Sequence, residues 1–323
     1  MKFVYVVVSS TEDHVAEQAL LSLFSLKKHN PEAKVTIVLD KETLDNLYGH
    51  RRDIIGYADE TIIADIPDGL LPTQRSRHIK TRLRPLVKGD FLYLDNDTVI
   101  TGSLESLKDL ECHVGAVLNR HINIWNKTHL HPMLDEYYAM TNVRPEEDER
   151  IEWFFNGGVF YSRDTGPSRR FFETWHEKWL HSSLNLGFHK DQPDMWRANM
   201  QCGNIIEPVP GIYNFQAIYP NQAMKYYSDA RVFHYFSSIR WATHLKVKND
   251  GFLATVRNNG INAEAEETLE NIKNDYLEGL EIIMDAERDN FNTPLVIAAR
   301  NLSRKYPSLN RMARKVYRFF HRR

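Results

Sequence analysis

Residues Phe91–Ile100 read FLYLDNDTVI and join a short apolar run to a pair of acids. The apolar and aromatic residues Phe91–Leu94 have the composition of a buried strand in a parallel sheet. Asp95 and Asp97 follow at once, and alternate residues of an extended chain point to the same side, so their carboxylates can lie together. Because ligands of an open α/β sheet bind beyond the carboxyl ends of the strands, this stretch predicts a ligand site at a sheet edge.

The tripeptide Asp95-Asn96-Asp97 allows two interpretations. Neighbouring carboxylates repel each other unless a cation or a proton lies between them, which favours a divalent metal whose shell a diphosphate completes. The same tripeptide is good turn chemistry, which favours a plain polar turn after a buried strand. The three residues alone do not separate these interpretations, so the decision depends on the rest of the chain.

The bulk properties describe one large folded domain with appendages. A chain of 323 residues with an ordinary apolar fraction can bury a sizeable core, and a net charge of −2 gives no case for a nucleic-acid partner. Cys112 and Cys202 are too few for a disulfide framework or a zinc cluster, and we expect free thiols. The opening MKFVYVVVSS predicts a strand rather than a signal sequence, and no stretch is long enough to span a bilayer, so we expect a cytoplasmic protein.

The first part of the chain alternates strands and helices. Apolar runs predict strands over residues 3–8, 35–39 and 61–64, with a helix between the first two that ends at Asn30-Pro31. This alternation is typical of a parallel, doubly wound sheet. The loop after the first strand is then a candidate nucleotide site, where base or ribose could bond to Ser9, Thr11, Glu12 and Asp13. Capping of the following helix is an equally good interpretation of these side chains.

A strongly basic segment, Gln74–Lys88, leads directly into the acidic motif. A helix there would place Lys80 and Arg84 on one face, near a bound diphosphate. Arg82 is a third candidate in the same segment. Solvation is the usual state of such side chains, so we expect only one or two of them to contact a ligand.

Three later stretches carry further candidates. Adjacent glycines after Asn156 indicate a close backbone approach to a ligand or to a neighbouring element, and Asn156 could bond to that ligand. Asp191 and Gln192 could contact substrate hydroxyls or simply begin a helix ahead of a proline. His234 stands alone in an apolar run, where a satisfied core histidine is the more common outcome. Residues 119–150 are polar and without a clear period, and their histidines could line an acceptor pocket.

Taken together, these stretches resemble the retaining glycosyltransferases of family 8, the group that contains glycogenin and bacterial lipopolysaccharide sugar transferases. The segment FLYLDNDTVITGSL is similar to the family's YLDADTVV-G-L segment with its Asp-x-Asp (DXD) motif, and RLRPL, FNGGVFYS and DQPDMW resemble further family segments in the same order. His234, Arg240 and Trp241 resemble the late H-x-x-G-x-x-K-P-W motif, with Ser237 in place of the glycine. The resemblance covers residues 3–241.

The resemblance implies an α/β GT-A fold, which is a Rossmann-like, mixed and mostly parallel sheet flanked by helices. It also implies a metal-dependent enzyme that moves a sugar, with retention, from a UDP-sugar to a glycan or lipid-linked saccharide in surface polysaccharide or lipopolysaccharide synthesis. Two carboxylates with an imidazole suit Mn²⁺, or else Mg²⁺. By this resemblance the metal ligands are Asp95, Asp97 and His234, the donor-binding residues include Arg82, Asn96 and Arg240, and the sugar-positioning residues are Asn156, Asp191 and Gln192.

The C-terminal region predicts a second part of the protein. We expect a catalytic domain over residues 1–250 and a helical extension over 251–323, acidic over 263–289 and basic from Arg300 to Arg323. The basic residues alternate with apolar and aromatic ones, which favours an amphipathic segment on the anionic inner face of the membrane. A solvated tail, or pairing with the acidic helix, is the alternative.

Two other functions fit parts of this pattern. A sugar nucleotidyltransferase also combines a Rossmann-like sheet with acidic metal ligands, but it normally carries a glycine-rich loop after the first strand, and Ser9–His14 contains no glycine. A non-catalytic module that binds membrane or nucleic acid through the basic tail gives no reason for the acidic pair, Asn156-Gly157-Gly158 and the late histidine to occur together. We therefore expect a transferase without a nucleic-acid partner.

Overall fold

The computed structural model describes residues 1–122, 132–142, 153–239, 242–280 and 293–305. The chain divides into two units, Met1–Leu280 and Glu281–Arg323. The described part of the second unit contains helix α13 (Pro294–Lys305). Within the described ranges, no helix has both the length and the apolar character needed to cross a membrane.

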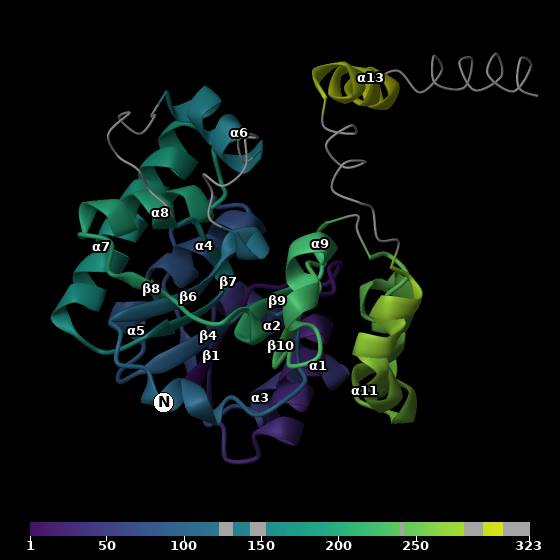
Figure 1. Ribbon diagram of the computed structural model, residues 1–323. Helices are drawn as coiled ribbons and strands as arrows, with labels where there is room; N and C mark the ends of the chain where they lie inside the picture. Colours follow the sequence, from purple (N-terminus) through teal and green to yellow (C-terminus); the bar gives the residue numbers. More distant parts are fainter. Residues whose placement is uncertain (123–131, 143–152, 240–241, 281–292, 306–323) are drawn as a thin grey trace, which may run out of the picture. The chain divides into compact units, whose positions relative to one another are not determined.

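A seven-stranded sheet forms the centre of the first unit (Figure 1). Its strand order is β3-β2-β1-β4-β7-β6-β8. Strand β7 runs antiparallel to both β4 and β6, whereas the remaining neighbours are parallel. The mixed, mostly parallel sheet that the sequence predicts is thereby confirmed. The strands are β1 (Lys2–Val7), β2 (Lys34–Leu39), β3 (Glu60–Ile63), β4 (Phe91–Leu94), β6 (Val114–Leu118), β7 (Phe155–Ser162) and β8 (Ile206–Pro208).

A smaller sheet of three strands, in the order β5-β10-β9, adjoins the acidic motif. Strand β10 pairs antiparallel with β5, so that His234 lies opposite Thr98, and parallel with β9, so that His234 lies opposite Gln216. Because β5 begins directly after Asp97, the acidic motif connects the large sheet to the small one. The small sheet consists of β5 (Thr98–Ile100), β9 (Phe215–Gln216) and β10 (Val232–His234).

Helices cover both faces of the large sheet (Figure 1). Helix α6 falls within residues 119–150, for which the sequence predicts no element, so that prediction missed a helix. The helices of the first unit are α1 (Val15–His29), α2 (Lys41–Asn46), α3 (Asp53–Gly56), α4 (Pro72–Thr81), α5 (Leu83–Leu86), α6 (Pro132–Thr141), α7 (Gly166–Leu180), α8 (Gln192–Gln201), α9 (Pro220–Ala223), α10 (Asp250–Asn259) and α11 (Ala263–Glu278).

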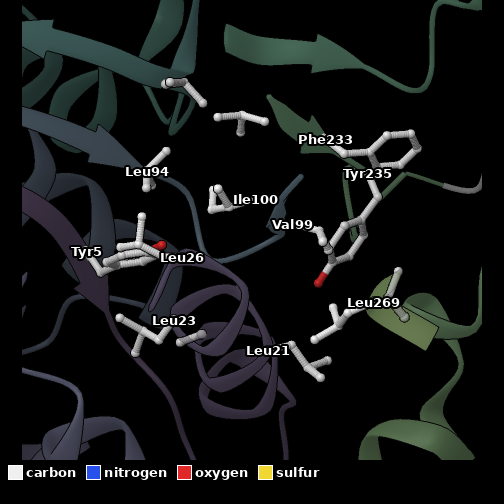
Figure 2. Packing of buried hydrophobic residues seen from close by; sticks show 14 of the residues in the cluster. Tyr5, Leu21, Leu23, Leu26, Leu94, Val99, Ile100, Phe233, Tyr235 and Leu269 are labelled. Atoms are coloured by element: carbon white, nitrogen blue, oxygen red, sulfur yellow. The ribbon is translucent and has the colours of Figure 1, made fainter. Parts of the chain in front are cut away.

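One hydrophobic cluster joins helix α1 to the small sheet and to helix α11. Figure 2 shows side chains of this cluster from all three places, among them Leu21 of α1, Val99 of β5 and Leu269 of α11. A second cluster lies on the other face of the large sheet, where Phe171, Phe172 and Trp175 of α7 pack on Phe160 of β7. The aromatic stripe of α7 is therefore packing, as its helical spacing indicates.

Helices α10 and α11 belong to the first unit, although the sequence places residues 251–280 with the C-terminal extension. Arg257 of α10 donates to Glu17 of α1 through Nε at 2.6 Å. Tyr276 of α11 is fully buried and donates from its hydroxyl to the carbonyl of Ala217 at 2.8 Å. The first unit therefore extends to residue 280 and not to residue 250, because both helices bury one face against the rest of this unit.

Candidate active site

The acidic motif lies in a turn between the two sheets. Asp95 and Asp97 occupy this turn and not an extended strand. The two carboxylates do lie near each other, as the sequence predicts, but the turn and not the alternation of an extended chain brings them together. The turn is anchored by a bond from the Asp95 amide to the carbonyl of Gly158 at 2.8 Å, and by one from Asn96 Nδ2 to the carbonyl of Val6 at 2.9 Å. The two interpretations of the sequence are thus compatible, since the turn itself brings the acids together.

His234 completes a group of three side chains that could hold a metal ion. Its Nε2 lies 3.2 Å from Asp97 Oδ1, and one ligand atom from each of Asp95, Asp97 and His234 lies within 4.8 Å of the others. Two carboxylates and an imidazole are a donor set that suits Mn²⁺, and Mg²⁺ less well. The antiparallel pairing of β5 with β10 is what carries the histidine to the acids.

Gly158 leaves the space in which these ligand groups converge. A Cβ at residue 158 would lie 2.3 Å from His234 Cε1 and 2.8 Å from Asp95 Oδ2, which no side chain tolerates. The second glycine, Gly157, faces Lys80 and Asp191, and a Cβ there would meet ordinary contacts of 3.7 Å or more. The residues present therefore fit a divalent cation. The missing side chain at Gly158 leaves room for both His234 and Asp95 beside it.

The Asp97 carboxylate is held ionised by its neighbours. Burial alone would raise its pKa, but the His234 imidazole and hydrogen bonds from His234 and Ser237 outweigh burial and hold the pKa of Asp97 well below its usual value. Ser237 donates to Oδ2 from its amide at 2.8 Å and from its hydroxyl at 3.1 Å. Ser237 thus supplies two hydrogen bonds to an acid of the candidate metal site.

A chain of asparagines orients the histidine. His234 Nδ1 lies 3.2 Å from Asn214 Oδ1, and Asn214 Nδ2 donates to Asn156 Oδ1 at 2.8 Å. Because the NH₂ group of Asn214 donates to Asn156, its oxygen faces the ring and accepts a hydrogen bond from the Nδ1–H group. Nε2 is then the ring nitrogen that faces Asp97, and it is the one that a cation would use as a ligand.

Asn156 is occupied by protein partners in this arrangement. Its Oδ1 also accepts from the Gly158 amide at 2.9 Å, and its Nδ2 donates to Asn119 Oδ1 at 3.4 Å. The structure therefore gives Asn156 a positioning role behind His234 and Gly158. Its predicted contact with the donor sugar stays a prediction. Asn214 has no distinguishing signal in the sequence.

Lys80 is the basic residue that reaches the acids. Its Nζ lies 3.3 Å from Asp95 Oδ1 and 3.3 Å from Asp191 Oδ2, and 4.9 Å from the centre of the Tyr93 ring. Burial lowers the pKa of Lys80, but Asp191 and Asp95 raise it by more, so the ammonium group stays charged. The Asp191 pKa is lowered, since Lys80 and Arg77 outweigh the opposite effect of burial.

The other two basic candidates lie elsewhere. The prediction that Lys80 and Arg84 share a helix face is wrong, because α4 ends at Thr81. Arg84 is buried and donates to the carbonyl of Gly89 at 2.6 Å. Arg82 Nη1 lies 3.1 Å from His78 Nε2, so its predicted contact with the donor stays a prediction.

Asp191 and Gln192 begin helix α8, and the Asp191 side chain makes no capping bond. The two residues therefore begin a helix ahead of Pro193, as that alternative predicts, but the Asp191 carboxylate faces Lys80 and does not cap the helix. Gln192 is buried, and its Nε2 has no hydrogen-bond partner among the described residues. A buried donor without a partner is costly, so a ligand group that accepts from Gln192 fits this position.

The loop after β1 is held mainly by internal bonds. Ser9 Oγ donates to Asp13 Oδ1 at 2.5 Å, and Arg51 Nη2 donates to Ser9 Oγ at 2.7 Å. Asp13 Oδ1 also accepts from the amide of Val15 at 3.0 Å, so capping describes these two side chains well. Thr11 and Glu12 are exposed. Nucleotide binding by Ser9, Thr11, Glu12, Asp13 and Asn96 stays a prediction, and Arg240 and Trp241 lie outside the described residues.

Comparison with known proteins establishes the fold. No protein-family model and no curated protein sequence matches this chain. Among solved structures, the chain is similar to the galactosyltransferase LgtC in complex with donor and acceptor sugar analogs, with a TM-score of 0.54 and 16% identity over 83% of this chain and 100% of that one. An active-site mutant of LgtC gives a TM-score of 0.52 and 15% identity over 89% and 99%.

Mouse xyloside xylosyltransferase 1 in its apo form gives a TM-score of 0.48 and 11% identity over 73% of this chain and 97% of that one. The likeness to LgtC shows that the chain has the GT-A fold of glycosyltransferases, which the resemblance implies. At these identities the likeness concerns the fold, and the chemistry has to be argued from the site.

Proposed function

We propose that this protein is a metal-dependent glycosyltransferase that moves a sugar from a UDP-sugar to a saccharide acceptor, with retention at the anomeric carbon. The observation that carries the proposal is the convergence of Asp95, Asp97 and His234 around Gly158 at the carboxyl end of β4 in a GT-A sheet. Ligands of such sheets bind at this edge. The retaining outcome rests on the family resemblance.

The residues around the acids would have two roles: to bind the cation and to stabilise the departing diphosphate. Asp95, Asp97 and His234 would hold the cation, which supplies Lewis-acid neutralisation of the departing diphosphate. Lys80 adds a buried positive charge beside Asp95 and keeps Asp191 ionised. Arg240 is the proposed second cation for the diphosphate, since a guanidinium can hold two phosphate oxygens at once.

The remaining residues position the sugar. Gln192 offers its buried amide to a donor hydroxyl, and Asp191 lies one residue away with its carboxylate ordered by Lys80. Asn156 fixes His234 through Asn214, and it fixes the Gly158 backbone directly. The donor sugar is then held between the cation site and the start of α8, where preorganised groups act without reorganising during the reaction.

The test is a screen of UDP-sugars for Mn²⁺-dependent release of UDP, which needs no acceptor. The wild-type protein is expected to release UDP, and excess chelator or Asp97→Asn is expected to abolish the release. Full activity in excess chelator would refute the metal assignment. Formation of UTP and sugar 1-phosphate from a UDP-sugar and added pyrophosphate would favour a sugar nucleotidyltransferase instead.

The proposal includes a place for the enzyme at the cytoplasmic face of an anionic membrane, where it would act on a lipid-linked or surface-polysaccharide acceptor. In support, α13 combines basic residues with apolar ones, and Leu295 is 82% exposed. The sequence continues with further arginines and aromatics to Arg323, which lie outside the described residues. A protein truncated before Pro294 is expected to lose sedimentation with vesicles rich in anionic lipid. Undiminished sedimentation would refute this part.

A further inference from the structure

Strand β6 ends in a turn whose backbone is strained. Arg120 has φ 60° and ψ 9°, and His121 has φ 57°, so two consecutive residues other than glycine occupy the left-handed region. Side chains rarely adopt this conformation, and it persists only where the surroundings over-determine it. Such strain is concentrated at functional sites, which makes the turn worth explaining.

One buried residue holds the turn. Gln216 of β9 is fully buried and bonds to the turn at three points. Its Oε1 accepts from the Arg120 amide at 2.9 Å, its Nε2 donates to the Leu118 carbonyl at 2.9 Å, and its amide donates to His121 Nε2 at 3.3 Å. Because Gln216 lies opposite His234 in the small sheet, the turn is tied to the strand that carries the metal ligand.

The turn presents a guanidinium that has no acidic partner among the described residues. Arg120 makes no side-chain hydrogen bond or ion pair with any described residue, and its Nε is buried without a partner. The group lies over the ring of Tyr219 at 5.1 Å. Tyr219 lies 6.4 Å from Phe236, which stacks on His234 at 3.7 Å between ring centres. The rings of Tyr219 and Phe236 therefore connect the Arg120 guanidinium to His234 of the proposed metal site.

The sheet order indicates which substrate this cation faces. Strands β1, β2 and β3 lie on one side of β4, and their carboxyl ends are the nucleotide side under the proposed function. Strand β6 lies on the other side of β4, beyond β7. A substrate that meets the donor sugar from the β6 side is the acceptor. The neighbouring His121 adds no charge there, since burial and then Lys225 lower its pKa to about 4.

We propose that Arg120 and Tyr219 form an acceptor subsite for a saccharide that carries an anionic group, either a carboxylate or a phosphate. The proposal rests on the proposed glycosyltransferase function. Arg120 would bind the anion through its paired N–H groups, and the strained turn would fix its direction before the acceptor arrives. The stacking on Tyr219 keeps the guanidinium planar and ordered without neutralising it.

The experiment measures binding of the full-length protein, with Mn²⁺ and UDP present, to an array of neutral, uronic-acid and phosphorylated saccharides. The wild type is expected to bind the anionic saccharides and not their neutral counterparts. Comparison of the uronic-acid saccharides with the phosphorylated ones then identifies the preferred anion. Arg120→Gln is expected to weaken that binding roughly tenfold or more, and Arg120→Lys less, since a charged hydrogen bond is lost.

Four results would overturn the subsite: equal binding of neutral saccharides, no binding of any anionic saccharide, unchanged binding by Arg120→Gln, or an equal loss of UDP affinity in that variant. The last result would place the guanidinium on the donor. Release of UDP from a UDP-sugar by the wild type separates the two proposals. If UDP is released while the array shows no anionic preference, the subsite alone is refuted. If no UDP-sugar is cleaved, the proposed function fails as well.

Discussion

Replacing Gly158 with alanine should disrupt the proposed metal site while leaving the sheet intact. The new Cβ would lie 2.3 Å from His234 Cε1, so the imidazole has to retreat by about 1.1 Å to reach an ordinary contact of 3.4 Å. Metal–ligand distances tolerate deviations of only about 0.2 Å. We therefore expect Mn²⁺ affinity to fall by about 10- to 100-fold, and UDP release to fall by about 100-fold or more.

The assay is a Mn²⁺ titration followed by electron paramagnetic resonance, with UDP present, alongside urea unfolding of the metal-free protein. Overpacking is expected to lower the free energy of unfolding by about 1–3 kcal/mol, which leaves room for a folded variant. Gly157→Ala is the matched control, because its Cβ would meet contacts of 3.7 Å or more and no metal ligand. Gly158→Ala with wild-type Mn²⁺ affinity would refute the reasoning.

Three further predictions concern the groups around the site. Asn214→Ala removes the acceptor of the His234 Nδ1–H bond and should weaken Mn²⁺ binding about tenfold, with a loss of about 1–3 kcal/mol of unfolding free energy because Asn214 is fully buried, whereas unaltered affinity of the folded variant would contradict the orienting role. Lys80→Met should lower the metal-free unfolding free energy by about 3 kcal/mol in urea, and Mn²⁺ should restore part of it; equal stability of variant and wild type would count against the shared cation. Asp194 is fully buried, and burial raises its pKa from 3.8 to about 6, so its contribution to stability is present below pH 4 and is lost as the pH rises through 6. Urea unfolding across this window should show a loss of about 3 kcal/mol that Asp194→Asn abolishes, and the same slope in both proteins would disprove it.

Much of the large sheet could be predicted from the sequence. Strands buried on both faces, such as β1 and β4, consist of continuous apolar runs, and such runs are readable without tertiary information. The end of helix α4 was also readable, because a proline ring clashes with the carbonyl four residues earlier. Pro85 therefore excludes a continuous helix through Thr81, and with it the placement of Lys80 and Arg84 on one helix face.

The small sheet could not be predicted in the same way. Strands β5, β9 and β10 contain two or three residues each, which is too short for a period to show. Their pairing brings Ser237 to Asp97 across 140 positions of sequence. The residue pattern alone therefore predicts a core histidine at His234, and only the family resemblance predicts that it is a metal ligand. Gln216 lies in β9 and Asn214 directly before that strand, and their roles depend on the same pairing.

The position of the acidic turn between two sheets has a consequence for how the protein responds to metal supply. Asp95 follows the last residue of β4, Asp97 precedes the first residue of β5, and His234 is the last residue of β10. A cation held by all three would therefore bridge the two sheets, and it would bind the folded protein and not the unfolded chain. By mass action, free metal at a hundred times its dissociation constant would add about 2.7 kcal/mol to the free energy of unfolding. Manganese availability would then set the stability of the protein as well as its activity.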